Sequence, residues 1–456
     1  MSLFIANITH GWTGDAAGTR LTGAIRIEDD LIAEVGDLSP RPGEQVIDAG
    51  GCVVAPGLVN THHHLFQSVL KGVPAGMDAA LDDWLERVPY TFWPRIDEET
   101  LRISARIGLV ELALTGATTV CDHHYLFSDR YDYDPAEVLF DEARRLGLRF
   151  VLARGGMTRG REFGGDVPPA PTETLAQFLD GVGAAAARWT DPSPRPMTRV
   201  VCAPTTPNFN LSPESLPEIA AEARHLGLRL HAHLSENTAY AAQTLRAFGQ
   251  RPVPWLAQND WLGPDVWFAH LVDLAPEEVA LLAGTGTGMA HCPQANARLG
   301  SGIAPAPALH AQGGVVSLAV DGAGANEAAD MGAALYSAFA VQRARGGVEA
   351  ADVATVMHWA TAGGASVLGM PSIGRIAPGM AADIVLFDLA APRNFGLHDP
   401  ALAPVVTGAV QVRHSFVGGR PVVRNGRLNG VNLAELAADA ARVTARLART
   451  REAVTA

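Results

Sequence analysis

Three consecutive histidines end an apolar stretch near the start of the chain, Ala55-Pro-Gly-Leu-Val-Asn-Thr-His-His-His-Leu-Phe-Gln67. Alternate side chains of a β-strand share a face, so His62 and His64 would point one way and His63 the other. Two imidazoles on one face are spaced to hold one metal ion. Ordinary histidine-rich loops also contain His-x-His, so the interpretation depends on further ligands at the ends of other strands.

Other apolar runs also end in side chains that can bind a metal or move a proton. His231-Ala-His233-Leu-Ser-Glu236 ends one run, Trp267-Phe-Ala-His270 a second, and Ala319-Val-Asp321 a third. Each has an ordinary alternative by itself: His270 could be a core histidine, and Asp321 a turn or helix-cap residue. Their common position at strand ends predicts a metal site.

The ligand set that we predict is His62, His64, His233 and Asp321. Three imidazoles and one carboxylate suit one Zn²⁺ per chain, with Fe²⁺ or Mn²⁺ as the alternatives. A coordination position must stay open for water, whose pKa falls to about 7 on a bound divalent ion.

Three residues are predicted to be catalytic: Glu236, His270 and Asp321. His270 is placed to orient the attacking water, and Asp321 can touch both the metal and that water. Glu236 lies three residues beyond His233 and suits a proton shuttle between the water and a ring nitrogen of the substrate.

A repeated alternation of strand and helix predicts the elements that bring these residues together. The predicted strands span 53–64, 118–126, 149–155, 199–205, 228–234, 266–272, 288–292 and 315–321. The predicted helices span 97–115, 135–146, 172–189, 213–226, 238–248, 276–283, 305–312, 331–343 and 351–368. Eight such units predict an α/β fold, a (β/α)8 TIM-type barrel, whose catalytic groups lie at the carboxyl ends of the strands. A doubly wound open sheet is the alternative.

Short strands without helices occupy both ends of the chain. Beyond residue 373 they are expected at 382–387, 405–412, 414–417 and 421–423. We predict that residues 1–54 and 373–430 form one small β-sandwich domain, that residues 55–372 form the barrel, and that residues 431–456 form a C-terminal helix.

The composition narrows the function classes. The formal net charge is −13, with no basic cluster, which argues against nucleic acid or an anionic membrane surface as partners. No charged-then-apolar leader and no apolar span of about 18 residues is present. The four cysteines lie far apart, so we expect buried thiols in a reducing, cytoplasmic setting.

Four motifs resemble the amidohydrolase superfamily, and more narrowly its heterocycle aminohydrolase branch. They are Pro56–His64, His231–Glu236, His291–Gly302 and Val320–Asn326, and the resemblance extends over essentially the whole chain, including Gly374–Asp383. It implies one bound zinc, a metal-dependent aminohydrolase acting on C–N bonds of cyclic amidines, and a homodimer or higher homo-oligomer.

The only lysine, Lys71, separates branches of that superfamily. Dihydropyrimidinase-like relatives hold two metals bridged by a carbamylated lysine on the fourth strand. The corresponding segment here is Arg199-Val-Val-Cys-Ala-Pro-Thr-Thr206, so the resemblance implies a site with one metal.

The finer resemblance is to isoxanthopterin and 8-oxoguanine deaminases, through Thr61–Gln67, Asp122–Phe127 and Leu152–Met157. It implies hydrolytic deamination of a bicyclic 2-amino-4-oxo heterocycle, with isoxanthopterin or a related pterin preferred over 8-oxoguanine or guanine. Hydrolysis of s-triazines is a further alternative. Two alternatives belong to other function classes: an enzyme that opens a cyclic amide ring, and a scaffold protein without catalytic activity.

Residues for substrate recognition are expected near the metal. Gln67 can pair with an amide-like ring edge, and Arg154 could fix a carbonyl. Trp84 and Phe92 could cover the ring, and His124 and His231 could line the pocket. The structural alternatives are a salt bridge for Arg154 and packing for the aromatic residues.

Overall fold

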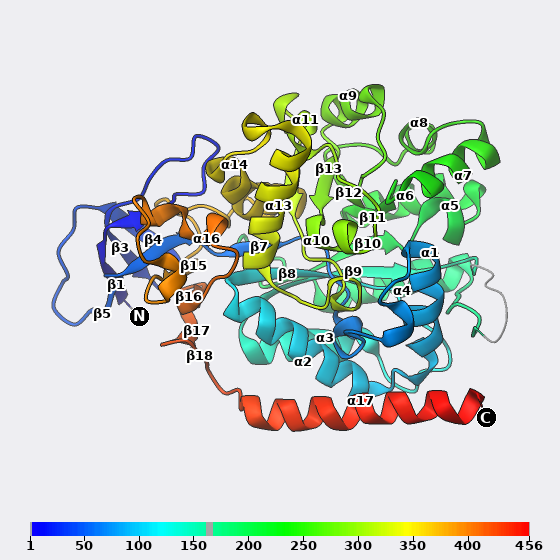
Figure 1. The fold of residues 1–456 in the computed structure, drawn as a ribbon, viewed down its shortest axis with the longest axis horizontal. Helices are drawn as coiled ribbons and strands as arrows, with labels where there is room; N and C mark the ends of the chain where they lie inside the picture. The colour runs from blue at the N-terminus through cyan, green and yellow to red at the C-terminus, as the bar shows by residue number, and fades with distance from the viewer. Residues whose placement is uncertain (1, 161–166, 456) are drawn as a thin grey trace.

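Eight parallel strands form the centre of the protein, described here by a computed structural model of residues 2–160 and 167–455 (Figure 1). They lie in chain order around the sheet: β7 (Leu58–Asn60), β8 (Ala117–His124), β9 (Arg149–Gly156), β10 (Thr198–Pro204), β11 (Leu230–Leu234), β12 (Val266–His270), β13 (Gly288–His291) and β14 (Val316–Leu318). Contacts between the first and last strands bring the sheet nearly to closure: Asn60 Oδ1 accepts from the Val320 amide at 3.0 Å, and the His62 carbonyl accepts from the Asp321 amide at 3.1 Å. The predicted (β/α)8 barrel is therefore confirmed.

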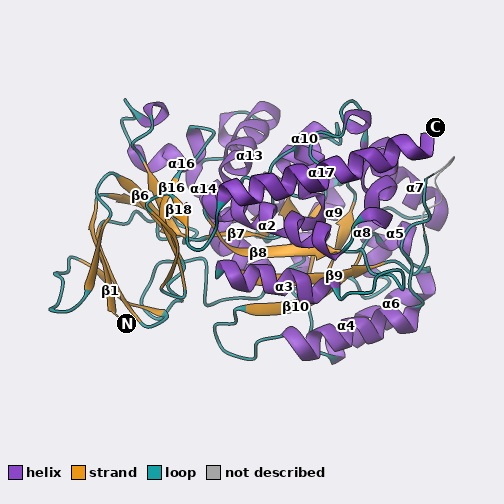
Figure 2. Ribbon diagram, turned by 90° about the horizontal axis from the view of Figure 1, so that it is seen from below, coloured by secondary structure: helices purple, strands orange, loops and turns teal. Residues whose placement is uncertain are grey.

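Helices surround the sheet and connect its strands (Figures 1 and 2). They are α1 (Leu81–Leu85), α2 (Glu98–Leu114), α3 (Pro135–Leu146), α4 (Leu175–Trp189), α5 (Pro207–Asn210), α6 (Leu216–His225), α7 (Thr238–Phe248), α8 (Pro252–Ala257), α9 (Pro276–Thr285), α10 (Pro293–Arg298), α11 (Ala306–Ala311), α12 (Ala323–Asn326), α13 (Met331–Gly346), α14 (Val353–His358) and α15 (Gly364–Val367). Local sequence sets their ends. In α3, for example, the Asp134 side chain caps the first turn and Gly147 stops the helix at φ 75°.

Short turns of 3₁₀- or π-helix fill the connections. They are η1 (Leu65–Val69), η2 (Pro74–Gly76), η3 (Glu86–Tyr90), η4 (Trp93–Arg95), η5 (Pro213–Ser215), η6 (Val348–Ala350), η7 (Trp359–Gly363), η8 (Pro392–Asn394) and η9 (Pro400–Leu402). The first four lie in the long connection between β7 and α2. The π-helical η7 joins α14 to α15, so the predicted helix 351–368 contains a change of helix type.

The predicted first strand, residues 53–64, is in fact two strands with different partners. Residues Cys52–Pro56 form β6, which pairs antiparallel with β15 (Ile384–Asp388) outside the barrel, and β7 begins only at Leu58. The break falls at Gly57, where an added Cβ would lie 2.0 Å from Thr118 Oγ1. The chain-end sheet thus extends to residue 56, and the three histidines follow β7 in irregular backbone.

Two sheets lie beside the barrel, one built from N-terminal strands alone and the other from strands of both chain ends (Figure 2). One sheet has the order β4-β3-β1-β5, from β1 (Ser2–Ile8), β3 (Gly23–Glu28), β4 (Leu31–Gly36) and β5 (Gln45–Asp48). The other has the order β18-β17-β16-β15-β6-β2, with β2 (His10–Gly11), β16 (Val412–Val417), β17 (Arg420–Arg424) and β18 (Arg427–Leu428). Ile5 and Ile25 of the first sheet share a buried core with Val54, Leu386 and Phe416 of the second.

The strand predicted at 405–412 is wrong. Residues Ala403–Val406 form a short helix, α16, and β16 starts at Val412. The Thr407 hydroxyl donates to the Ala403 carbonyl at 2.9 Å, and Gly408 then turns the chain at φ 75°. Valine-rich sequence favours strands, but here local capping determines the conformation.

The C-terminal helix α17 (Leu433–Thr455) lies along the barrel across α2 (Figure 2). Arg442 and Arg446 form ion pairs with Glu99 at 2.6 and 2.9 Å. Within residues 2–160 and 167–455, no helix combines the length and apolar character needed to cross a membrane.

A buried ion pair joins the barrel to the chain-end sheets. Arg149, at the start of β9, donates to both carboxylate oxygens of Asp383 at 2.6 and 2.9 Å, and the same carboxylate accepts from the Gly418 amide at 2.8 Å. Both side chains are 1% exposed. The Arg149 guanidinium also donates to the carbonyls of Arg195 and Pro196, so the pair is well satisfied.

We expect Asp383→Ala to lower the free energy of unfolding by about 3–5 kcal/mol, because it leaves the Arg149 charge buried without its partner. The matched control is Asp30→Ala, which breaks the half-exposed Arg195–Asp30 pair and should cost less than about 1 kcal/mol. Urea unfolding of both variants measures the difference, and similar losses would contradict it.

Candidate metal centre and active site

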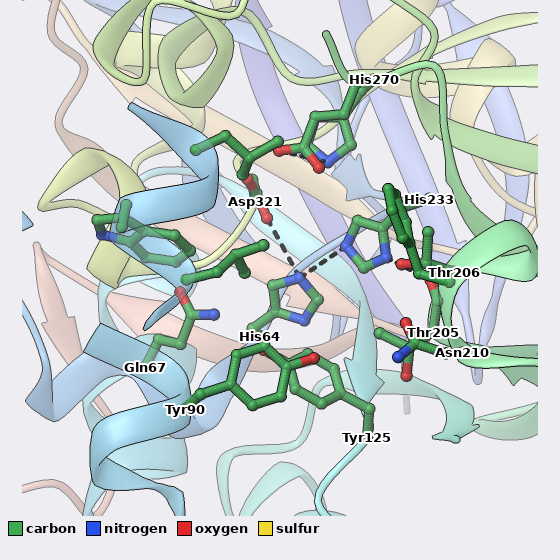
Figure 3. Close-up of a pocket in the computed structure, with 15 residues that line it drawn as sticks. His64, Gln67, Tyr90, Tyr125, Thr205, Thr206, Asn210, His233, His270 and Asp321 are labelled. Atoms are coloured by element: carbon green, nitrogen blue, oxygen red, sulfur yellow. Dashed lines mark hydrogen bonds and ion pairs between the residues drawn. The ribbon is translucent and has the colours of Figure 1, made fainter. Parts of the chain in front are cut away.

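The imidazoles of His62, His64 and His233 and the carboxylate of Asp321 converge at the carboxyl ends of the barrel strands; Figure 3 shows His64, His233 and Asp321. Asp321 Oδ1 lies 3.5 Å from His62 Nε2 and 3.4 Å from His64 Nε2. His64 Nε2 lies 3.1 Å from His233 Nε2. The barrel therefore brings the four predicted ligands together from the ends of β7, β11 and β14.

Hydrogen bonds on the far side of each ring determine which nitrogen faces the centre. His64 Nδ1 lies 2.7 Å from the His123 carbonyl, and His233 Nδ1 lies 2.7 Å from the Thr205 carbonyl. A carbonyl can only accept, so both Nδ1 atoms carry the proton, and in the neutral ring each Nε2 is left with a lone pair.

Burial keeps these rings neutral. It lowers the pKa of His62, His64 and His233 well below the ordinary value, and the neighbouring imidazoles lower it further. Two lone pairs 3.1 Å apart repel each other unless a cation lies between them. The donor set therefore fits a divalent metal ion and suits zinc chemically.

The groups predicted to move protons lie beside this centre. His270 Nε2 is 3.6 Å from Glu236 Oε1, and His270, Glu236 and Asp321 have atoms within 4.8 Å of one another. His270 Nδ1 donates to Asn296 Oδ1 at 2.9 Å, which fixes the ring with Nε2 toward the site. Burial raises the pKa of Asp321. The three predicted catalytic residues are thus adjacent.

The backbone at these strand ends is strained. His270 has φ 73° and Asp321 has φ 62°, in the left-handed region that residues with a Cβ rarely adopt. Ser235, between His233 and Glu236, has φ 48°. Such strain is typical of functional sites, and here it turns the chain sharply where the side chains must face inward.

A cavity that is partly open to solvent lies directly over the centre (Figure 3). Its walls come from the strand ends, from the connection after β7 and from α5. It is lined by His64, Gln67, Leu81, Trp84, Leu85, Tyr90, Tyr125, Thr205, Thr206, Phe209, Asn210, His233, Glu236, His270 and Asp321. Among these described lining residues there is no lysine or arginine, so they offer no cationic side chain to bind an anionic ligand.

Two of the predicted substrate contacts, Gln67 and Trp84, line this cavity. Gln67 lies against Gly322, where an added Cβ would be 2.0 Å from its Oε1, and that buried Oε1 has no hydrogen-bond partner among the described residues. The Trp84 indole donates to the Gly324 carbonyl at 3.0 Å, which fixes its ring in the wall.

The other predicted substrate contacts lie outside the described lining of the cavity. Arg154 binds Glu173 through two bonds of 2.6 and 2.7 Å and lies over the Phe127 ring. An added Cβ on Gly181 of α4 would touch the guanidinium, so Arg154 points out toward that helix. Phe92, also named in the sequence analysis, is buried and is not in the lining either.

His124 and His231 are also displaced from the cavity. His124 pairs with Arg154 in the β8–β9 register and packs near Phe127, at 5.3 Å between ring centroids, on the outer face of the sheet. His231 lies inside the barrel, below the cavity, where its Nε2 is 2.8 Å from His62 Nδ1.

His123 is the inward-facing histidine of β8, which the sequence analysis missed. Its ring lies 4.9 Å from His233, and a cluster of His62, His123 and His233 has ring nitrogens within 4.8 Å of one another. Strand alternation could have identified it, because adjacent residues point to opposite faces. Tyr90, Tyr125 and Asn210 were also missed, and nothing in the local sequence distinguishes them.

A family model described as the Amidohydrolase family matches residues 53–422, most of the chain. The chain belongs to the amidohydrolase family. An isoxanthopterin deaminase of an unknown prokaryotic organism is 49% identical, over 93% of this chain and 92% of the relative. The 8-oxoguanine deaminase of Pseudomonas aeruginosa is 36% identical, over 93% and 94%.

A solved member of the same fold is the atrazine chlorohydrolase TrzN of Arthrobacter aurescens TC1, complexed with zinc. It is 27% identical, with a TM-score of 0.89 over 97% of this amidohydrolase and 100% of that chain. These comparisons confirm the predicted family and identify the chain as an enzyme with deaminase relatives.

Proposed function

We propose that this amidohydrolase is a zinc-dependent hydrolytic deaminase of a bicyclic 2-amino-4-oxo heterocycle, with isoxanthopterin or a related pterin as its substrate. The observation that carries the proposal is the convergence of the Nε2 atoms of His62, His64 and His233 with Asp321 beneath a cavity that also holds Glu236 and has no lysine or arginine among its described lining residues. The isoxanthopterin deaminase at 49% identity supports the choice of substrate.

His62, His64, His233 and Asp321 would hold the metal, which when bound lowers the pKa of a water ligand and so supplies a nucleophile near neutral pH. Fe²⁺ and Mn²⁺ remain alternatives to zinc. Water replaces the exocyclic amine with oxygen, and ammonia leaves.

The chain's own residues direct the protons in this reaction. Glu236 accepts a proton from the attacking water and delivers it to the ring nitrogen next to the amine-bearing carbon. His270, oriented by Asn296, faces both Glu236 and Asp321 and orients the water between them. Such positioned acid–base groups typically accelerate a reaction by about 10²–10⁴-fold.

Gln67 and Trp84 provide recognition of a flat ring. The unpaired Gln67 Oε1 can accept from a ring N–H, while its amide N–H donates to a ring carbonyl. The indole of Trp84, with its N–H already bound to Gly324, presents an apolar surface. A neutral pterin meets both requirements, and so does 8-oxoguanine.

Ammonia-coupled screening of the zinc-loaded protein tests the proposal. We expect turnover of isoxanthopterin to exceed that of 8-oxoguanine, guanine and an s-triazine panel. Turnover led by 8-oxoguanine would shift the assignment to the purine, as the 36% identical deaminase allows. Release of chloride or amine from a triazine alone would favour the triazine alternative. No turnover of any 2-amino-4-oxo heterocycle would overturn the proposal.

Gly322→Ala is expected to raise KM for the heterocycle about 10-fold or more, on the scale of the 1–3 kcal/mol cost of an overpacked site. Its Cβ would collide with Gln67, whereas the backbone, at φ −67°, accepts alanine without strain. The control is Gly284→Ala in α9, where no atom lies within 4 Å of the added Cβ and the helical backbone also accepts alanine. Steady-state kinetics and zinc content distinguish displacement of Gln67 from loss of the metal.

A cytoplasmic location and a homodimer or higher homo-oligomer remain predictions. Size-exclusion chromatography with light scattering measures the oligomeric state, and a mass of one chain would contradict the second prediction.

A further inference from the structure

His231 lies behind the metal centre and contacts one of its ligands. Its Nε2 is 2.8 Å from His62 Nδ1, and its Nδ1 is 3.0 Å from the Trp267 carbonyl. The side chain is fully buried and is not in the lining of the cavity among the described residues. A direct substrate contact therefore does not explain its position.

The direction of both hydrogen bonds follows from the carbonyl. The Trp267 carbonyl can only accept, so His231 Nδ1 must carry the proton. In neutral His231 the Nε2 is then an acceptor, and the proton of the second bond belongs to His62 Nδ1. His62 is left with an unprotonated Nε2, the atom that lies 3.5 Å from Asp321 Oδ1.

Trp267 holds the His231 ring in this position. The two rings stack at 4.5 Å between centroids, with an interplanar angle of 20°. The Trp267 indole also donates to the carbonyl of Thr61 at 3.3 Å, directly before His62. Trp267 of β12 therefore positions both the backbone just before His62 and, through His231, the His62 ring.

We propose that His231 is a positioning residue for the metal centre, which holds His62 in the Nδ1–H tautomer with Nε2 toward the metal. The other two ligand histidines donate to carbonyls, which are fixed acceptors. His62 depends on a side chain instead, so its orientation is sensitive to substitution. The inference rests on the proposed metal site.

Two substitutions separate the bond to His62 from the bond to Trp267. In the His231→Gln variant, the side-chain amide places an acceptor near the position of Nε2, which faces His62. In the His231→Asn variant, the shorter amide places a donor near the position of Nδ1, which faces Trp267. We expect His231→Asn to weaken zinc binding about 10–100-fold, as is typical for loss of an outer-shell partner, and His231→Gln to restore most of the affinity. His124→Asn, at a buried histidine on the outer face, is the control.

Zinc affinity is measured by chelator competition, with the thermal unfolding of metal-free protein as a second readout. Equal affinities of the Gln and Asn variants would overturn the proposal, because a purely structural role does not distinguish them. Failure of the wild-type protein itself to bind zinc would instead overturn the proposed metal site.

The cobalt-substituted wild-type protein provides a test that needs no variant. Proton NMR should show three exchangeable, paramagnetically shifted N–H signals, one from each ligand histidine. Two such signals would mean that His62 carries no N–H, which would overturn the proposed tautomer.

Discussion

Glu236→Gln is expected to lower ammonia release from the heterocycle by about 10²–10⁴-fold, the usual contribution of a positioned general acid–base group. Glutamine has nearly the same size and can keep a contact with His270, 3.6 Å away. It cannot accept the proton from water or pass one to the ring. The loss should therefore appear in kcat, with zinc content and substrate affinity little changed.

The control for that variant is the metal content of the same sample. Glu236 is outside the predicted ligand set, so the Gln variant should bind as much zinc as the wild type. Full activity with normal zinc would exclude Glu236 as the shuttle and leave His270 and Asp321 as the remaining acid–base groups within 4.8 Å. Loss of zinc would mean that Glu236 belongs to the donor set.

Much of the metal centre could be predicted because its residues follow a positional rule. His233, His270 and Asp321 each end an apolar run, and a parallel barrel brings such ends together. The rule does not depend on knowing any contact in advance. At the first strand the predicted boundary was wrong, because Gly57 divides one apolar run between two sheets, but His62 and His64 still reach the centre.

The walls of the cavity could not be predicted in the same way. Arg154 and His124 end their strands, yet both side chains face outward, because the register of β8 with β9 places them on the same face. Their neighbour His123 faces inward, and alternation along the strand would have selected it. Tyr90 comes from the π-helical turn η3 and Asn210 from a short helix, and long-range packing alone brings them to the site.

The three histidines after β7 yield the second prediction. His64→Ala should lower zinc affinity by more than the roughly 10–100-fold typical of outer-shell partners, because it removes a donor 3.4 Å from Asp321 Oδ1. His63→Ala should leave the affinity nearly unchanged. The His63 ring turns away from the centre, donates to the Asp321 carbonyl and lies against Gly108 of α2.

Thermal unfolding with and without zinc separates these roles, since a ligand that binds only the folded state stabilises it by about 2.7 kcal/mol at 100 times its Kd. His63→Ala leaves a buried gap and should lower Tm, but zinc should still raise that Tm as it does in the wild type. His64→Ala should lose the zinc-dependent increase. If both variants lose the zinc-dependent increase in Tm equally, His63 supports the centre through the Asp321 backbone. The alternation of side chains after β7 would then not distinguish a metal ligand from a structural residue.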